Sequence, residues 1–409
     1  MKENAICDLE EHTTEQRQLW MNRKEILNRR LGQLLRSSEE SWFGSWKFLL
    51  LGELLNCKNF DSLLECLVKE LKSECKLEVD EGLIKVILGG TRHVCEPDKP
   101  KHKKDCYIAK VGHCDQGMSA ILLNAADTVG VSYDKAFQLL KRALIELDAN
   151  ESNKRKPIIL VLDHEVQMFP WENIPILRQL EVYRMPSVNS ISAFVDTGCK
   201  SEEEAAKNCL SFPSIDPFHA FYILNPDGTL PQFQSSFEDW FKENNMKGIA
   251  GLDPSEDLWA SALEKHDLFI FSGHGCGWQY FPLEGFSKLN KCGAAVLLGC
   301  ESSITTLRGN FAPLCVPLEY LVAGSPAVVG NLWNISALDI CRFGKHLLQS
   351  WLVKRHELEK ESLDHAPTLG VFMGASRDAC RLRYLTGAAP VLYGVPTQIC
   401  VKKNVSNLS

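Results

Sequence analysis

The chain has 409 residues, of which 45% are hydrophobic and 24% are charged, a composition that excludes wholesale disorder and predicts two or three folded domains. The formal net charge of -7 gives no global attraction to nucleic acid or to an anionic membrane. No apolar run is long enough for a transmembrane helix, and the polar first residues lack the apolar core of a secretory signal. We therefore expect a cytosolic or nuclear protein whose 16 cysteines are mostly reduced.

The first part of the sequence is predicted to be helical. Between Gln16 and Arg36, and again after Phe60, apolar residues recur at spacings of three and four, which places them on one face of a helix. The apolar residues within 80–89 predict a strand, and residues 115–148 return to a helical pattern. We expect a structural helical subdomain here, not a membrane-binding or calmodulin-binding helix.

A polar segment between Thr91 and Lys104 predicts a solvated loop. Six potential metal ligands lie in or near it, and they are His93, Cys95, His102, Cys106, His113 and Cys114. Their spacings match no standard structural zinc motif. We therefore favour an exposed loop over a zinc site.

The character of the sequence changes after a polar linker that ends at Lys156. Continuous apolar runs without polar alternation now predict strands that are buried on both faces. These runs are 157–162, 220–225, 268–271, 294–298 and 326–333. Helical segments separate several of them, including one that we expect Asp253 to cap and another over residues 338–355. We predict a mainly parallel α/β sheet over residues 156–409, with a domain boundary near residue 155.

Two of the predicted strands lead into residues with reactive side chains. The run Leu268–Phe271 leads into His274, which stands between two glycines, and the run Ala294–Leu298 leads into Cys300, which directly follows a glycine. Because ligands bind beyond the carboxyl ends of the strands in an open parallel sheet, we expect both side chains at neighbouring strand tips. A thiol beside an imidazole and free backbone amides is the arrangement that a thiol protease needs.

Other interpretations of these residues are open at this point. A cysteine in a strand is usually part of the core, and a histidine at a strand end is often only a loop residue. Zinc binding by His274, Cys276 and Cys300 is a competing chemistry, although the sequence offers no obvious fourth ligand. The occurrence of both reactive residues on glycine-flanked strand tips favours the catalytic interpretation.

Several ordered blocks of the sequence resemble the C-terminal protease region of separases, which are caspase-like cysteine endopeptidases. The matching blocks are 41–51, 161–175, 221–226, 271–277, 297–303 and 330–340. The resemblance covers most of residues 15–395 and implies a caspase-like α/β protease domain over residues 156–409, in which a mainly parallel sheet is flanked by helices. Residues 1–155 are then expected to form a helical hairpin and a largely helical, pseudo-protease, substrate-binding half.

The same resemblance implies roles for individual residues. Cys300 is expected to be the nucleophile and His274 the general acid and base, which protonates the leaving amine. The backbone amides of Gly275 and Cys300 are expected to form the oxyanion hole. No metal or organic cofactor is expected.

Separases cleave after arginine, typically in Glu-x-x-Arg, so the resemblance implies a carboxylate in the substrate pocket. Asp339 is the first candidate and Glu301 the second, while Trp333 is a candidate wall for the arginine stem. Asn334, next to Trp333, is also expected to contact the substrate. A solvent-facing carboxylate at a helix start is the alternative for Asp339. The sequence departs from the family at Asn334, where aspartate is usual, at Glu301, where serine is usual, and at Cys276, where alanine or serine is usual.

The resemblance implies an endopeptidase that cleaves the kleisin subunit of cohesin to release sister chromatids, with a securin-type inhibitor as pseudosubstrate. It places the protein in the cytoplasm and nucleus, on the spindle or chromosomes in mitosis, with no direct nucleic acid or membrane partner. The family's helical solenoid is absent from this sequence, so we expect either a separate solenoid chain as partner or a fragment. One alternative is a catalytically weak scaffold or securin-binding module, and another is a caspase-like protease with unrelated substrates.

Overall fold

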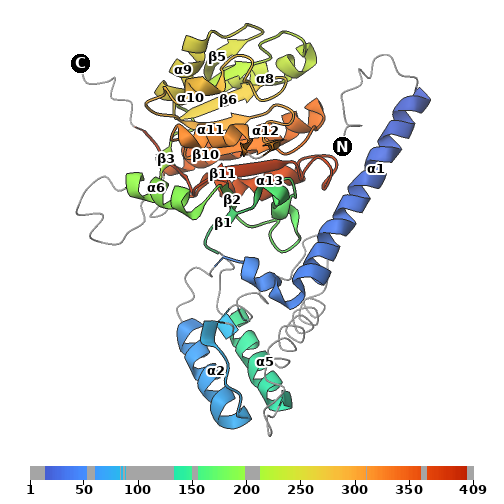
Figure 1. The fold of residues 1–409 in the computed structure, drawn as a ribbon, viewed down its shortest axis with the longest axis vertical. Helices are drawn as coiled ribbons and strands as arrows, with labels where there is room; N and C mark the ends of the chain where they lie inside the picture. Colours follow the sequence, from blue (N-terminus) through green and yellow to red (C-terminus); the bar gives the residue numbers. More distant parts are fainter. Residues whose placement is uncertain are drawn as a thin grey trace. The chain divides into compact units, whose positions relative to one another are not determined.

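An eight-stranded sheet, in the order β1-β2-β11-β10-β7-β6-β4-β5, organises the larger part of the computed structural model (Figure 1). The structure describes residues 14–52, 60–82, 84–85, 88, 133–149, 155–198, 212–309, 311–360 and 366–402. The strands of the large sheet are β1 Ile158–Val161, β2 Val182–Met185, β4 Ala220–Leu224, β5 Lys247–Ala250, β6 Leu268–Ser272, β7 Ala294–Leu297, β10 Ala327–Asn331 and β11 Pro390–Gly394.

The sheet is mainly parallel, as the continuous apolar runs predicted. Strands β5, β4, β6, β7 and β10 run parallel to one another, and β11 runs parallel to β2. Strand β11 runs antiparallel to β10, with Ala327 opposite Gly394. Every residue of β6, β7, β10 and β11 is buried, which explains why these strands lack polar alternation.

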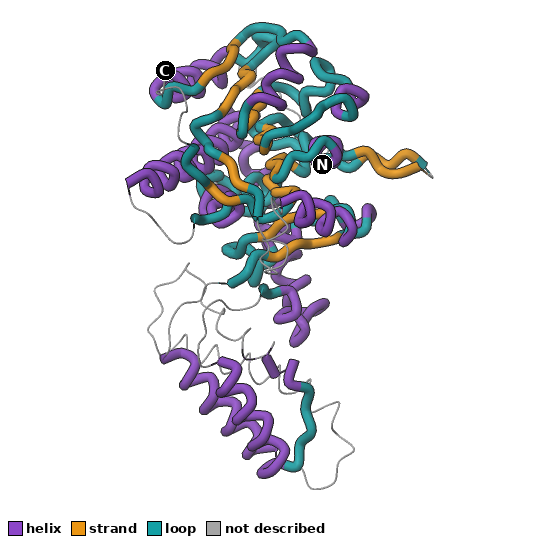
Figure 2. Tube along the Cα trace, turned by 90° about the vertical axis from the view of Figure 1, so that its left-hand side faces the viewer, coloured by secondary structure: helices purple, strands orange, loops and turns teal. Residues whose placement is uncertain are grey.

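Helices lie on both sides of these strands (Figure 2). They are α6 Val188–Gly198, α8 Pro231–Glu243, α9 Glu256–Lys265, α10 Leu283–Phe286, α11 Val316–Val322, α12 Ala337–Lys360 and α13 Met373–Asp378. Helix α8 buries Phe233, Phe237 and Phe241, which stand four residues apart on one face. Helix α12 approaches the sheet closely because Gly344 lacks a side chain: a Cβ there would lie 2.6 Å from the Cδ1 atom of Leu298.

Short elements complete this part of the chain. They are the 3₁₀ turns η4 His164–Val166, η5 Trp171–Asn173 and η6 Leu369–Phe372, the pair β3 Ser214–Ile215 with β12 Gln398–Ile399, and the hairpin β8 Thr306–Arg308 with β9 Phe311–Leu314. Helix α9 begins two residues later than expected, because the Ser255 hydroxyl, and not Asp253, accepts the cap hydrogen bond from the Leu258 amide.

The chain divides into two compact units. The larger unit comprises residues 1–32, 159–173 and 181–409, and the smaller one comprises residues 33–158 and 174–180. The expected division of function at residues 155 and 156 stays a prediction; that boundary lies close to Ile158, where the smaller unit's longer segment ends.

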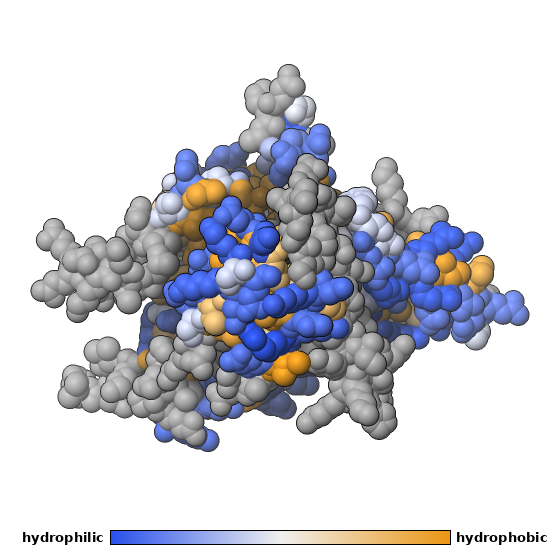
Figure 3. Space-filling model, turned by 90° about the horizontal axis from the view of Figure 1, so that it is seen from below, coloured by the Kyte–Doolittle hydropathy of each residue, from blue (hydrophilic) through white to orange (hydrophobic). Residues whose placement is uncertain are grey.

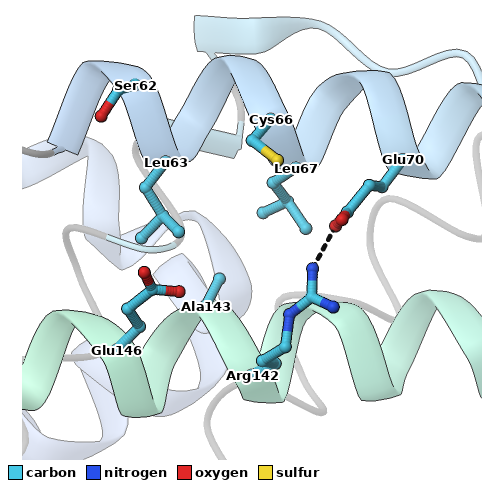
Figure 4. A pocket seen from close by; sticks show the side chains of 8 residues that line it. All are labelled: Ser62, Leu63, Cys66, Leu67, Glu70, Arg142, Ala143 and Glu146. Atoms are coloured by element: carbon cyan, nitrogen blue, oxygen red, sulfur yellow. Dashed lines mark hydrogen bonds and ion pairs between the residues drawn. The ribbon is translucent and has the colours of Figure 1, made fainter.

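The smaller unit is built on two helices, α2 Phe60–Cys75 and α5 Tyr133–Ala149, which pack through a buried apolar cluster that includes Leu64, Leu67 and Leu140. A cavity of about 420 Å³ opens between them (Figure 4). It is lined by Ser62, Leu63, Cys66, Leu67, Glu70, Arg142, Ala143 and Glu146. None of the predicted catalytic or substrate-binding residues lines this cavity, so it is not part of the predicted active site.

Before α2 the chain is helical over residues 14–50, as the spacing of the apolar residues predicted. Helix α1 covers Thr14–Ser37, and the π-helical turn η2 Ser38–Phe43 and the 3₁₀ turn η3 Gly44–Leu50 follow. The strand predicted over residues 80–89 is wrong, because the described residues 81, 82, 84, 85 and 88 are helical. Ile84 and Leu88 stand four residues apart and are both buried in the α2–α5 cluster, so tertiary packing decided the conformation.

The described surface gives no sign of a membrane-spanning element. No helix in the described part of the chain is both long and apolar enough to cross a bilayer. Among the residues coloured in Figure 3, hydrophilic ones prevail, and apolar ones form smaller patches between them.

Candidate active site

The loops that carry His274 and Cys300 are in direct contact. Strands β6 and β7 are parallel neighbours, and Phe271 pairs with Leu297, so both loops leave the same edge of the sheet. A Cβ atom placed on Gly299 would lie only 1.7 Å from the carbonyl oxygen of Gly275. The absence of a side chain at Gly299 is therefore what allows the two loops to meet, and the structure brings the two predicted catalytic segments together.

Unusual backbone conformations occur on both loops. Gly275 has φ +66° and Gly277 has φ +89°, a region that glycine enters without steric cost. Gly275 is exposed, and His274 beside it is half-buried. Glu301 has φ +57° although it carries a side chain. Left-handed conformations at residues other than glycine store strain and cluster at functional sites.

Cys300 is half-buried at the tip of β7. Its thiol donates a weak hydrogen bond to the carbonyl oxygen of Ile335, at 3.5 Å, on the segment that follows β10. Burial raises the pKa of the Cys300 thiol, and the negative charge of the neighbouring Glu301 raises it further. The thiol is therefore mostly protonated at neutral pH in this state of the chain, and thiolate formation requires help from a substrate or a base.

Two of the residues predicted to bind substrate meet beside the nucleophile. The side-chain amide of Asn334 donates a hydrogen bond of 2.9 Å to a carboxylate oxygen of Glu301. This contact joins the segment after β7 to the segment after β10. Trp333, the predicted wall, is buried, and its indole N–H is committed to the carbonyl oxygen of Leu385 at 2.8 Å.

The structure places Asp339, the first candidate for the substrate carboxylate, in the first turn of α12. Only 4% of the residue is exposed, so the alternative of a solvent-facing carboxylate is wrong. One oxygen accepts hydrogen bonds from the Arg342 side chain at 3.0 Å and from the Arg381 amide at 2.9 Å. The other oxygen accepts from the Ser336 hydroxyl at 3.3 Å. Asp339 is thus already occupied by partners from its own chain.

Sequence reasoning missed a buried polar pair that holds the Cys300 loop. The side-chain amide of Asn331 donates to the carbonyl oxygen of Gly299 at 3.0 Å, and its backbone amide donates to the Ser302 hydroxyl at 2.9 Å. The same hydroxyl donates to the carbonyl oxygen of Leu297. One signal was present in the sequence, since Asn331 is the single polar residue that ends the apolar run of β10.

The competing zinc interpretation finds no support at this edge. Among the residues that the structure describes, no group of three histidine, cysteine or acidic side chains is placed to hold a metal ion, so His274, Cys276 and Cys300 do not form one. Cys276 is buried, and burial raises the pKa of its thiol. The six candidate ligands from His93 to Cys114 lie outside the described residues.

The fold and the two adjoining loops define a caspase-like α/β protease domain. The family model of the separin protease domain matches residues 1–340, and the chain therefore belongs to the separin family. This confirms the resemblance to separases that the sequence blocks suggested.

Individual relatives agree with the family assignment. The chain is 33% identical over 402 residues to separin from Mus musculus and 32% identical over 395 residues to separin from Emericella nidulans. These matches cover 97% and 92% of this chain, but the chain spans only 17% and 19% of the length of those relatives. The crystal structure of the Saccharomyces cerevisiae separase–securin complex matches with a TM-score of 0.76 at 24% identity, covering 97% of this chain and 27% of the other. That match confirms the predicted fold.

Proposed function

We propose that the chain is a cysteine endopeptidase in which Cys300 is the nucleophile and His274 the general acid and base. The observation that carries this proposal is the contact between the two glycine-flanked loops, in which Gly299 stands against the carbonyl oxygen of Gly275. It places a thiol-bearing and an imidazole-bearing segment at one edge of a parallel sheet, where substrates of such sheets bind.

The reaction follows from the chemistry of these groups. The Cys300 thiol gives its proton to the His274 imidazole, and the resulting thiolate attacks the carbonyl carbon of the scissile peptide bond. The amides of Gly275 and Cys300 stabilise the resulting oxyanion. His274 delivers a proton to the leaving amine, and a thioester to Cys300 remains. Water then attacks the thioester, and hydrolysis releases the new carboxyl terminus and restores the thiol.

For the substrate, we follow the family: cleavage after arginine in Glu-x-x-Arg sequences of the kleisin subunit of cohesin, which separates sister chromatids. The matching yeast structures are complexes of separase with securin, and a securin-type inhibitor is the corresponding partner for this chain. A cytoplasmic and nuclear protein, on the spindle or chromosomes in mitosis, fits this role.

A cleavage assay on Glu-x-x-Arg peptides tests the proposal. Cys300→Ser is expected to abolish cleavage with the fold intact, because the change is nearly isosteric and the hydroxyl is a far weaker nucleophile. Cys341→Ser is the matched control, since Cys341 is also a half-buried thiol but stands on α12, against the Ser236 hydroxyl. Equal cleavage by the parent and by Cys300→Ser would remove the assignment.

The histidine is tested in the same assay. His274→Ala is expected to lose a large factor in kcat, about 10²- to 10⁴-fold, with KM little changed, because proton transfer is lost and substrate contacts are kept. A collapse of substrate binding with kcat retained would show that His274 has a structural role instead.

A second candidate function is a catalytically weak scaffold that binds a securin-type partner. The observation that favours it is the environment of Cys300, where burial and the Glu301 carboxylate both raise the pKa of the thiol. Under this alternative, an arginyl electrophile does not modify Cys300 even at high pH, whereas partner binding persists in Cys300→Ser.

A further inference from the structure

We propose that Glu301 couples substrate recognition to the nucleophile: a positively charged substrate side chain that binds the Glu301 carboxylate also makes the Cys300 thiol more reactive. The inference rests on the proposed function, because it concerns the same site and a basic substrate residue. The proposal gives a role to Glu301, the residue that follows the nucleophile and at which this sequence departs from its family.

Of the two predicted substrate carboxylates, Glu301 is the one that has room for a cation. Its side chain is exposed, and one oxygen accepts a single hydrogen bond, from the neutral amide of Asn334. Among the described residues, no lysine, arginine or histidine forms an ion pair with it. Asp339, by contrast, is buried and already receives Arg342 and the Arg381 amide, so an incoming guanidinium has to displace partners there.

The backbone holds Glu301 close to the nucleophile. Its left-handed conformation, with φ +57°, is unfavourable for a residue with a side chain, and the surrounding contacts maintain it. The hydrogen bond to Asn334 ties the residue to the segment whose Ile335 carbonyl accepts the Cys300 thiol. The carboxylate and the thiol therefore sit between the same two segments, and a ligand on one changes the surroundings of the other.

The electrostatics of the site give the direction of the coupling. Burial is the main cause of the raised pKa of the Cys300 thiol, and the Glu301 carboxylate adds to it. Titratable groups on the neighbouring elements include His274 and Cys276 on the loop after β6, and Asp339 and Cys341 in the first turns of α12, where Asp339 is already paired with Arg342. A cation on Glu301 cancels the adverse charge, so the thiol gives its proton more readily to solvent or to the imidazole.

This coupling is reciprocal by thermodynamic linkage: a cation that favours the thiolate is itself bound more tightly when the thiolate is present. An arginine-containing substrate then both docks and activates, whereas a neutral substrate meets a protonated nucleophile. For a half-buried thiol and an exposed carboxylate on adjacent residues, the expected change in the fraction of thiolate is about three- to tenfold.

Alkylation of Cys300 by iodoacetamide, followed by peptide mass spectrometry, measures the effect without requiring cleavage. The rate is recorded against pH for the parent chain and for Glu301→Gln, in which the glutamine oxygen can still accept the Asn334 hydrogen bond. Each is measured alone, with n-butylguanidinium as the probe cation, and with n-butylurea as its neutral isostere. Asp339→Asn provides the matched control for a carboxylate of the same edge.

We expect Glu301→Gln to shift the alkylation profile to lower pH and to raise the rate at neutral pH about three- to tenfold. Butylguanidinium should produce the same shift in the parent and in Asp339→Asn, no shift in Glu301→Gln, and butylurea no shift in any of them. Superimposable profiles for the parent and Glu301→Gln, or a cation effect that survives Glu301→Gln, overturn the proposal. The proposed function fails on a different result, namely cleavage that persists in Cys300→Ser.

Discussion

Gly299→Ala is the substitution that most sharply tests whether contact between the two loops creates the site. The added methyl carbon would stand 1.7 Å from the Gly275 carbonyl oxygen and 3.1 Å from that of Gly273, whereas real Cβ contacts stay above 3.0 Å. The loops must therefore separate by more than 1 Å. Because a misplacement of about 1 Å between reacting groups costs roughly 10²-fold in rate, we expect kcat/KM to fall by about that factor or more.

Gly293→Ala separates this local effect from general destabilisation. Gly293 precedes β7 at the opposite end of the strand, and a Cβ there would lie 2.4 Å from the carbonyl oxygen of His266, so it meets a comparable clash. Both variants are expected to lose about 1–3 kcal/mol of unfolding free energy from overpacking. Peptide cleavage is then compared at a temperature where thermal denaturation shows both variants folded. Equal activities of Gly299→Ala and Gly293→Ala would refute the loop-contact account.

Three further predictions concern the interior. Asn331→Ala should lower kcat more than it raises KM in the peptide assay and cost about 1–3 kcal/mol in a urea titration, because the buried Gly299 carbonyl loses its donor; a silent substitution contradicts this. Glu172→Gln should cost about 3–5 kcal/mol in the same titration, since it leaves the fully buried Arg184 guanidinium without its charge partner, and a loss below 1 kcal/mol would speak against it. Burial raises the pKa of the Cys292 thiol from 9.0 to about 12 and that of the Cys315 thiol to about 11. The two protonated thiols therefore contribute fully to the unfolding free energy below pH 9.0, and this contribution is lost as the pH rises toward the raised pKa values. Cys292→Ser should flatten that alkaline decline, and an unchanged slope contradicts the assignment.

The central strands and the loop pair were predictable because they depend on local and short-range patterns. A strand buried on both faces must be apolar throughout, so β6, β7 and β10 are visible as continuous runs. Parallel pairing then places the residues that follow these strands at one edge, which is why the sequence predicted that His274 and Cys300 lie at the same edge of the sheet. Their proximity depends on topology and does not require knowledge of side-chain packing.

Other features depend on contacts between distant residues and left little trace in the sequence. The antiparallel strand β11 pairs with β10 across some sixty residues of chain, and no local pattern specifies that pairing. The occupation of Asp339 by the Arg381 amide arises in the same way, from a segment 42 residues away. At Ile84 the apolar pattern was compatible with either strand or helix, and packing against α2 and α5 selected the helix.

The hydrogen bond between Glu301 and Asn334 illustrates the limit of prediction from the sequence. Both positions were recognised as departures from the family, but only the structure shows that one donates a hydrogen bond to the other. The two departures from the family pattern are thus one hydrogen-bonded pair in the site. Their 33-residue separation hides this relation, because it depends on β7 and β10 being neighbours in the sheet.

Covalent labelling of the intact chain with a peptidyl-arginyl electrophile tests the central claim most directly. The chain has 16 cysteines, so the labelled residue must be identified by peptide mass spectrometry. The account predicts a single stoichiometric adduct on Cys300, formed much more slowly in His274→Ala and not formed with a matched electrophile that carries citrulline in place of arginine. An adduct on another cysteine, or equal labelling by the arginine and citrulline reagents, would contradict the claim that Cys300 is the nucleophile of an arginine-directed protease.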